Sequence, residues 1–185
     1  MRRISVRFAL ALAAVVVAGC TPHYDWREYR PDCARTWCGF VASFPGRVTT
    51  ATRDVPVAAT ALPLSLHVVS VDDVTFAVGA FALRSDGDAA AARTVLENKL
   101  VDDVGGGSPR RDKVTMRATD RSAVEADTFD LDGPRGGHGV VRAVARFVER
   151  RDRLVEVLVV GPADTLSTDR GRQAVETFVT SVRLD

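Results

Sequence analysis

The sequence predicts an α+β fold, in which a largely antiparallel β-sheet is flanked by helices. Apolar and polar residues alternate with the period of two that is typical of β-strands, for example across residues 62–68. Two other stretches, residues 86–104 and 167–184, carry apolar residues at helical spacing. A chain of 185 residues, 46% of them hydrophobic, is long enough for one domain with a hydrophobic core.

Residues 1–19 have the features of a secretory signal peptide. Arginines at the start precede FALALAAVVVA, an apolar run of 11 residues, whereas a membrane-spanning helix needs roughly 20. The run ends in VAGC, where small residues precede Cys20 as in the lipobox of bacterial lipoproteins. We expect cleavage before Cys20 and attachment of a diacylglycerol to its thiol. The alternatives are an ordinary signal peptide and a short membrane anchor.

Lipid attachment at Cys20 predicts a location in the cell envelope. Two or more acyl chains anchor a protein stably, so the membrane is the first expected partner. Thr21 follows the cysteine. In the best-known bacteria, Asp at that position retains a lipoprotein in the inner membrane. Thr21 therefore favours the outer membrane, with the domain facing the periplasm.

The charge balance indicates no affinity for nucleic acid. The formal net charge is +1, so no strong field attracts polyanions. The glycine-rich stretch 105–113 lacks the Gly-Lys-Ser/Thr sequence of a phosphate-binding loop and is expected to be a plain loop. The sequence predicts no cofactor and no metal.

Two further cysteines, Cys33 and Cys38, lie in CARTWC. In the oxidising periplasm we expect a disulfide between them. Free thiols are one alternative, and a metal or redox pair is another. Redox motifs usually have two residues between the cysteines, whereas four stand here, and only His23 is close enough in sequence to complete a metal site.

Residues 20–37 are predicted to be a tether that is rich in aromatic residues. Tyr24, Trp26 and Tyr29 lie within a few residues of one another. Aromatic side chains at this density usually pack against something. The tether is expected to pack on the domain itself, residues 38–185, or else to present Trp26 to the membrane interface or to a partner.

Several strands follow the tether. Phe40 and Val41 begin the first, Pro45-Gly46 ends it, and VTTATRDV forms the second. In LPLSLHVVSV the leucines share one face and His67 lies on the other, as a surface histidine or one satisfied by hydrogen bonds rather than a catalyst. After a turn at 72–73, VTFAVGAFAL is apolar on both faces, which predicts a strand covered on both sides.

Residues 86–104 form the clearest helical pattern. Asp86 or Asp88 is expected to cap its start and Gly105 to end it. Two strand candidates follow, KVTMRAT and AVEADTFDL, and then a glycine-rich turn at 132–139 that contains His138. No second ligand or catalytic partner stands at a recognisable spacing from His138, so we assign it no role.

The segment VVRAVARFVERRDRLVEVLVVG predicts a long hairpin. Arg142, Arg146 and Arg150 fall on one face of its first strand. Such a row is typical of a solvated face paired with acids on the neighbouring strand, for example Glu156. The other interpretation is a surface that binds phosphate, carboxylate or a lipid headgroup.

A second helix is expected at the end of the chain. Ser167 or Thr168 would cap it. Four apolar residues face the core: Val175, Phe178, Val179 and Val182.

Several segments in this order resemble known proteins. YDWRE after the lipobox, FVASFPG, RFVERRDRLVEVLVVGP and ETFVTSVRL resemble a family of uncharacterised Gram-negative bacterial lipoproteins, whose usual Lys-Pro after FP-G is Arg47-Val48 here. FP after the first strand, V-x-V-x-G and F-x-x-S are also similar to PsbP-like domains. Over residues 24–184 the resemblance implies a PsbP-like α/β/α sandwich that binds or assists assembly. It transfers no catalytic residue.

These observations predict a non-enzymatic binding or assembly module. Its expected partner is an unknown envelope protein or a cell-wall component. The alternatives are a carrier of small ligands or anions, with the arginine row as its polar contact, and a hydrolase. No nucleophile elbow, zinc spacing or Ser-His-Asp set supports a hydrolase.

Overall fold

The computed structural model describes residues 24–33, 37, 39–85, 87–134, 139–150 and 152–185. Ten strands form one sheet in the order β1-β2-β10-β6-β7-β8-β9-β5-β4-β3, and every neighbouring pair is antiparallel except β10 and β6. The elements are β1 Arg27–Tyr29, β2 Phe40–Phe44, β3 Thr49–Val57, β4 Thr60–Val71, β5 Val74–Ala82, α1 Asp88–Val104, β6 Arg110–Ala118, β7 Ala123–Pro134, β8 Val140–Arg150, β9 Arg153–Pro162, α2 Ala163–Ser167, α3 Asp169–Ser181 and β10 Arg183–Leu184.

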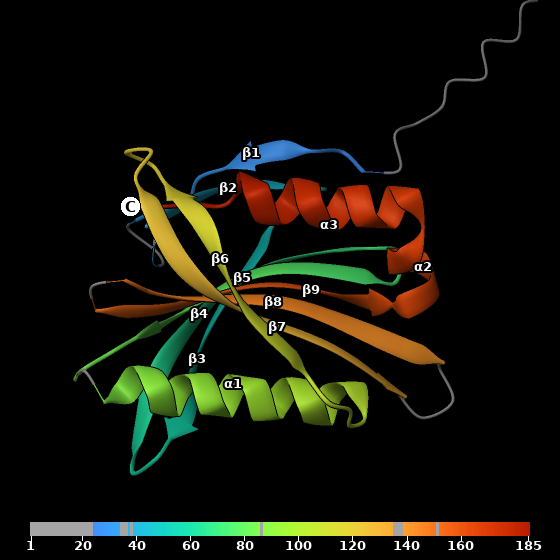
Figure 1. The fold of residues 1–185 in the computed structure, drawn as a ribbon. Helices are drawn as coiled ribbons and strands as arrows, with labels where there is room; N and C mark the ends of the chain where they lie inside the picture. Colours follow the sequence, from blue (N-terminus) through green and yellow to red (C-terminus); the bar gives the residue numbers. More distant parts are fainter. Residues whose placement is uncertain (1–23, 34–36, 38, 86, 135–138, 151) are drawn as a thin grey trace, which may run out of the picture.

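The predicted antiparallel sheet with flanking helices is therefore present, and strands dominate it. The sheet is strongly curled, with α1 on one side and α2 and α3 on the other (Figure 1). In the described part of the chain, no helix is both long and apolar enough to cross a membrane.

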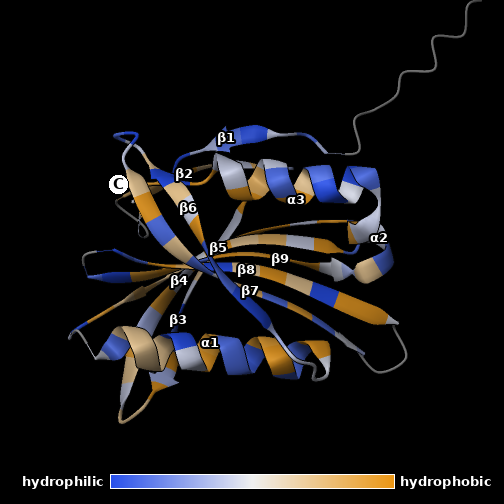
Figure 2. Cartoon of the chain, in the orientation of Figure 1, coloured by the Kyte–Doolittle hydropathy of each residue, from blue (hydrophilic) through white to orange (hydrophobic). Residues whose placement is uncertain are grey.

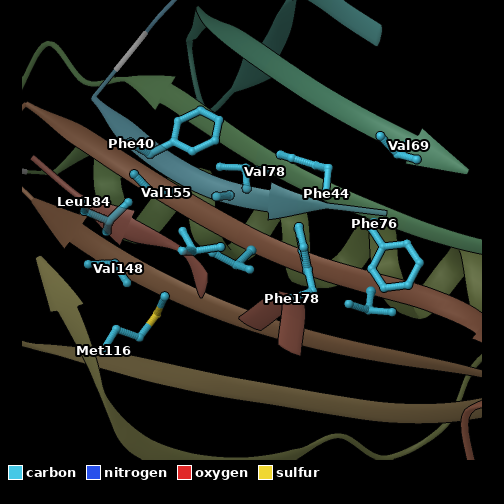
Figure 3. Close-up of a cluster of buried hydrophobic side chains, with 14 of the residues drawn as sticks. Phe40, Phe44, Val69, Phe76, Val78, Met116, Val148, Val155, Phe178 and Leu184 are labelled. Atoms are coloured by element: carbon cyan, nitrogen blue, oxygen red, sulfur yellow. The ribbon is translucent and has the colours of Figure 1, made fainter. Parts of the chain in front are cut away.

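Each face of the sheet has its own hydrophobic core. On the α3 side, Phe178 packs edge-on against Phe44 and Phe76, with ring centroids 5.1 and 5.3 Å away (Figure 3). On the opposite side, α1 buries the four residues that its periodicity predicts: Ala92, Leu96, Leu100 and Val104. Burial of these two faces accounts for the alternating pattern that predicted the strands.

The helix ends follow local capping chemistry. At α3, the Thr168 hydroxyl accepts a hydrogen bond from the Gly171 N–H at 2.9 Å, as predicted. At α1, Gly105 takes the left-handed conformation, with φ 84°, and closes the last turn. The Asp88 carboxylate does not cap α1 itself but accepts the backbone N–H groups of Arg84 and Ser85 in the preceding loop.

The C-terminal segment differs from the prediction. The helix expected over 167–184 is α3, which begins at Asp169 and stops at Ser181, and the short helix α2 before it was not expected. Arg183 and Leu184 then form β10, which joins β2 to β6. Two residues are too few to show a strand pattern in sequence.

The predicted tether contributes to the folded body. Its residues Arg27–Tyr29 form β1 and pair with β2. Tyr24 is buried, and Trp26 packs edge-on against Phe76 at 5.9 Å. Tyr24 and Trp26 therefore pack on the domain, which was the first of the two interpretations of these aromatic residues.

Candidate binding groove

A groove of about 520 Å³ lies between α3 and strands β6, β7 and β8. Its volume falls within the range of roughly 300–1,000 Å³ that is usual for ligand sites. An apolar surface lines its interior: Val114, Met116, Val144, Leu166, Val175, Val179 and Val182. Met116 also contributes to the α3-side core shown in Figure 3.

Arginines dominate the charged lining. Arg110, Arg117, Arg142, Arg146 and Arg172 line the groove, against the two carboxylates of Asp130 and Glu176. The first half of α3, which carries Arg172, is strongly hydrophilic (Figure 2). The groove therefore combines an apolar interior with an excess of positive charge.

Two of these arginines are held in place by acids of β7. Arg142 donates from Nε and Nη2 to the two oxygens of Asp132 at 2.7 and 2.8 Å, and from Nη1 to the Ser167 hydroxyl. This pairing lowers the pKa of the Asp132 carboxyl. Arg146 donates to Asp130 at 2.7 Å and is only 16% exposed. Both guanidinium groups are thereby fixed at the groove wall.

Two other arginines are less tightly held, and of these Arg110 lies opposite Asp130 on β7 and helps to lower the pKa of Asp132. Arg110 and Arg117 make no ion pair with any residue in the described ranges. Arg172 is held by Asp169 and by the backbone carbonyl of Ser167. The groove thus has some guanidinium groups fixed and others available to an anionic ligand.

The structure separates the predicted arginine row. Arg142 and Arg146 line the groove, whereas Arg150 donates to the Asp185 backbone carbonyl at 2.6 Å and lies beside a smaller hollow with Trp37. The expected pairing with Glu156 is wrong. Glu156 lies opposite Phe147, on the α1 side of the sheet, and the acids that pair with the row lie on β7.

One wall of the groove is a strand edge that could not be predicted from the sequence. β6 pairs with β7 along Arg110–Arg117, but on its other side it pairs with β10 only at Arg117 and Ala118. The consecutive residues 114–117 line the groove, so β6 presents its edge there as well as its α3-side face. Periodicity predicts strands, but it does not show which edges lack a neighbour.

The other predicted site residues lie apart from the groove. Trp26 packs against Tyr24 and Phe76, on residues that do not line it. Cys33 is disulfide-bonded, but Cys38 lies outside the described residues, so the predicted pairing of the two stays a prediction. Cys20, His23 and His138 also lie outside them.

His67 is fully buried, so of the two expectations the surface histidine is wrong, and the alternative of a ring satisfied by hydrogen bonds holds at Nδ1 but not at Nε2, which has no partner among the described residues. Its Nδ1 lies 3.1 Å from the Tyr29 hydroxyl, and its ring packs edge-on against Phe40. Burial lowers the pKa of His67 to about 4, partly offset by the nearby backbone of Trp37. No carboxylate bonds to this ring in the described structure, so the geometry suits packing rather than proton transfer.

Glu156 is the second buried titratable group. Its Oε1 has no hydrogen-bond partner among the described residues. Burial raises the pKa of its carboxyl to about 7, against a smaller opposing effect of Arg53. Residues in the described ranges form no group of three or more potential metal ligands around it or elsewhere.

Comparison with known proteins found similar structures but no match in sequence. No protein family and no curated protein matches the sequence. The chain is similar in structure to cyanobacterial PsbP (CyanoP) from Synechocystis sp. PCC 6803, at a TM-score of 0.49 and 16% identity, covering 90% of this chain and 96% of that one. It is also similar to PA94 from Pseudomonas aeruginosa, a protein of unknown function and putative regulator, at a TM-score of 0.36 and 16% identity, covering 83% and 96%. Both TM-scores are below 0.5, so neither similarity bears on function.

Proposed function

We propose that this protein is a non-enzymatic binding module of the bacterial envelope, and that it binds a partner protein through the groove between α3 and β6–β8. The observation that carries the proposal is the excess of arginine over acid on an apolar interior. An apolar centre gives affinity by burial, and fixed guanidinium groups select an acidic partner.

The envelope location is part of the same proposal. It is supported by the sequence VAGC at Cys20 and by Thr21 after it, which favours the periplasmic face of the outer membrane. The bacterial lipoprotein family and the PsbP-like α/β/α arrangement that the sequence resembles also belong to the proposal.

A second candidate function is a carrier of a small amphipathic anion. The observation in its favour is the volume of about 520 Å³, which suits a small molecule as well as a peptide segment. Such a ligand would place its apolar body on Val144 and Val179 and its anionic group near Arg110.

Photo-crosslinking in living cells tests the groove as a binding site. A photoreactive amino acid replaces Val179, inside the groove, or Thr50, an exposed residue of β3 as a control. We expect a protein adduct from position 179 alone, and we expect Arg142→Gln with Arg146→Gln to weaken it. The matched control Arg47→Gln alters an exposed arginine outside the groove and should leave the adduct intact. Equal adducts from positions 50 and 179 would contradict the proposal, and a small-molecule adduct would favour the carrier.

The anchor is tested separately. Cys20→Ser removes the thiol that would receive the lipid, so we expect loss of lipid labelling and accumulation of uncleaved precursor. Labelling with an alkyne-bearing fatty acid and gel mobility measure both. Normal membrane retention of processed Cys20→Ser protein would contradict the lipid anchor.

A further inference from the structure

The β6 edge beside the groove is an unfilled strand position in the sheet. β10 is parallel to β6 and covers its edge only at Arg117 and Ala118. Within the described part of the chain, no strand pairs with this edge over residues 110–116. Unpaired N–H and C=O groups of an edge are a template for another strand.

Hydrogen bonds at the end of β6 show which groups point to the open side. The Ala118 N–H donates to Ser122, toward β7, whereas the Thr119 N–H donates to Leu184, toward β10. Alternation along an extended strand directs the N–H groups of Thr115 and Arg111 to the same side as that of Thr119. Between them, the Lys113 N–H is bonded to the neighbouring Asp112 side chain at 2.8 Å. The open edge therefore offers main-chain donors beside the groove.

The opposite wall of the groove is formed by α3. Residues of α3 one turn apart face the edge: Arg172, Val175, Glu176, Val179 and Thr180. An extended segment of seven residues, about 23 Å long, would match residues 110–116. Its alternate side chains would lie on Val114 and Met116 on the α3 side of the sheet.

Charge selects the composition of the added strand. β6 carries four basic residues and one acidic residue, in the sequence RRDKVTMRA. On the side of β6 away from α3, the alternate positions hold Arg111, Lys113, Thr115 and Arg117, so three of the four are basic. Arg111 also pairs with Glu97, and Lys113 with Glu125, in exposed ion pairs that a partner's acids would share. Opposite charges directly across two strands stabilise their pairing, so acidic residues are favoured at these positions of the partner.

We propose that an extended segment of a partner protein adds to β6 as a further strand, in line with β10, with apolar residues toward α3 and acidic residues on the other side. This inference rests on the proposed function and specifies its ligand. Main-chain hydrogen bonds to the β6 edge would supply part of the affinity, as in other strand-addition complexes.

A peptide of alternating valine and glutamate, seven residues long, is the probe. Its affinity for the purified full chain is compared with that of the same peptide N-methylated at alternate residues, and with a valine–lysine peptide. Each main-chain hydrogen bond contributes about 1 kcal/mol, so we expect N-methylation to weaken binding at least about tenfold. The valine–lysine peptide should not bind. Equal affinity of the methylated peptide would overturn strand addition.

Hydrogen exchange locates the bound peptide. We expect the amides of Arg111 and Thr115 to gain protection, and that of Thr52, on the β3 edge, to stay unchanged. Thr115→Pro removes the edge donor and should abolish binding, whereas Thr115→Val keeps the N–H and should retain it. If Thr115→Pro does not fold, the methylated peptide and the exchange pattern still decide. No protection at Arg111 and Thr115 would refute the proposal.

The outcomes separate the two proposals. If the groove gives its protein adduct in cells but the peptide neither binds nor protects β6, the binding function stands and strand addition fails. If dodecyl phosphate binds with loss on Arg146→Gln and no peptide binds, the groove is a small-ligand site and both proposals are overturned.

Discussion

Glu156 and His67 are buried on opposite faces of the sheet, and their burial makes stability depend on pH in opposite directions. The native carboxyl of Glu156 has a pKa of about 7, above its ordinary 4.5. Between these two pH values the native state therefore binds more protons than the unfolded chain. His67 has a native pKa of about 4, below its ordinary 6.5. Between pH 4 and 6.5 the unfolded chain therefore binds more protons than the native state.

Glu156→Gln should remove the loss of stability with rising pH. In the wild type, the contribution of Glu156 is fully present below pH 4.5 and is lost as the pH rises to about 7. That loss is on the order of 3 kcal/mol. We expect the variant to match the wild type near pH 4.5 and to be more stable at pH 8, measured by urea unfolding. An unchanged difference between the two proteins across this range would mean that Glu156 is not neutral in the native state.

His67→Phe should remove the opposite dependence. The contribution of His67 is fully present above pH 6.5 and is lost as the pH falls to about 4. Phenylalanine keeps an aromatic ring beside Phe40 and does not titrate. We expect the free energy of unfolding of His67→Phe to rise relative to that of the wild type as the pH is lowered from 6.5 to 4. Between 4.5 and 6.5 the two wild-type contributions oppose each other, so only the single variants reveal each slope.

The helices illustrate what sequence could predict at the scale of elements. The apolar stripe of α1 and the cap at Thr168 are local patterns, and both are confirmed. β10 could not be predicted, because two residues show no periodicity and the pairing depends on segments distant in sequence. Only part of the groove could be predicted from the sequence. The spacing of Arg142 and Arg146 predicted that they share a face of one strand. Tertiary structure alone brings Arg110, Arg172 and the β6 edge beside them.

Thr168→Ala should destabilise α3. Its hydroxyl accepts the Gly171 N–H, and loss of such a cap costs about 1 kcal/mol. Thr180→Ala is the matched control, since that hydroxyl bonds the Glu176 carbonyl inside the same helix and is not a cap. Chemical denaturation should show a loss for Thr168→Ala and little change for Thr180→Ala. Equal losses would argue that the cap contributes nothing specific.

At the scale of the whole molecule, Leu184 connects two parts of the sheet. It is buried in β10, which pairs with β2 on one side and β6 on the other. Leu184→Ala should lower the free energy of unfolding by about 2–5 kcal/mol. We also expect faster hydrogen exchange at the Thr119 amide, whose acceptor is the Leu184 carbonyl.

Leu131→Ala provides the comparison for that variant. Leu131 is equally buried, but it lies in the core on the α1 side. We expect a similar loss of stability without selective exposure of the Thr119 amide. If both variants change exchange at Thr119 alike, β10 is not a separate weak point of the sheet.

The position of β10 also has a consequence for biosynthesis. A ribosome makes β2 and β6 well before β10, yet β2 reaches β6 only through β10, and the Ser43 N–H meets the Ser181 hydroxyl across 138 residues of chain. Contacts of such long range form late in folding. During translation, Phe44 is therefore made long before α3, whose Phe178 covers it. For most of its synthesis, a nascent chain of this protein therefore exposes the apolar strand β2. We expect a chaperone to keep this strand from aggregating with other chains.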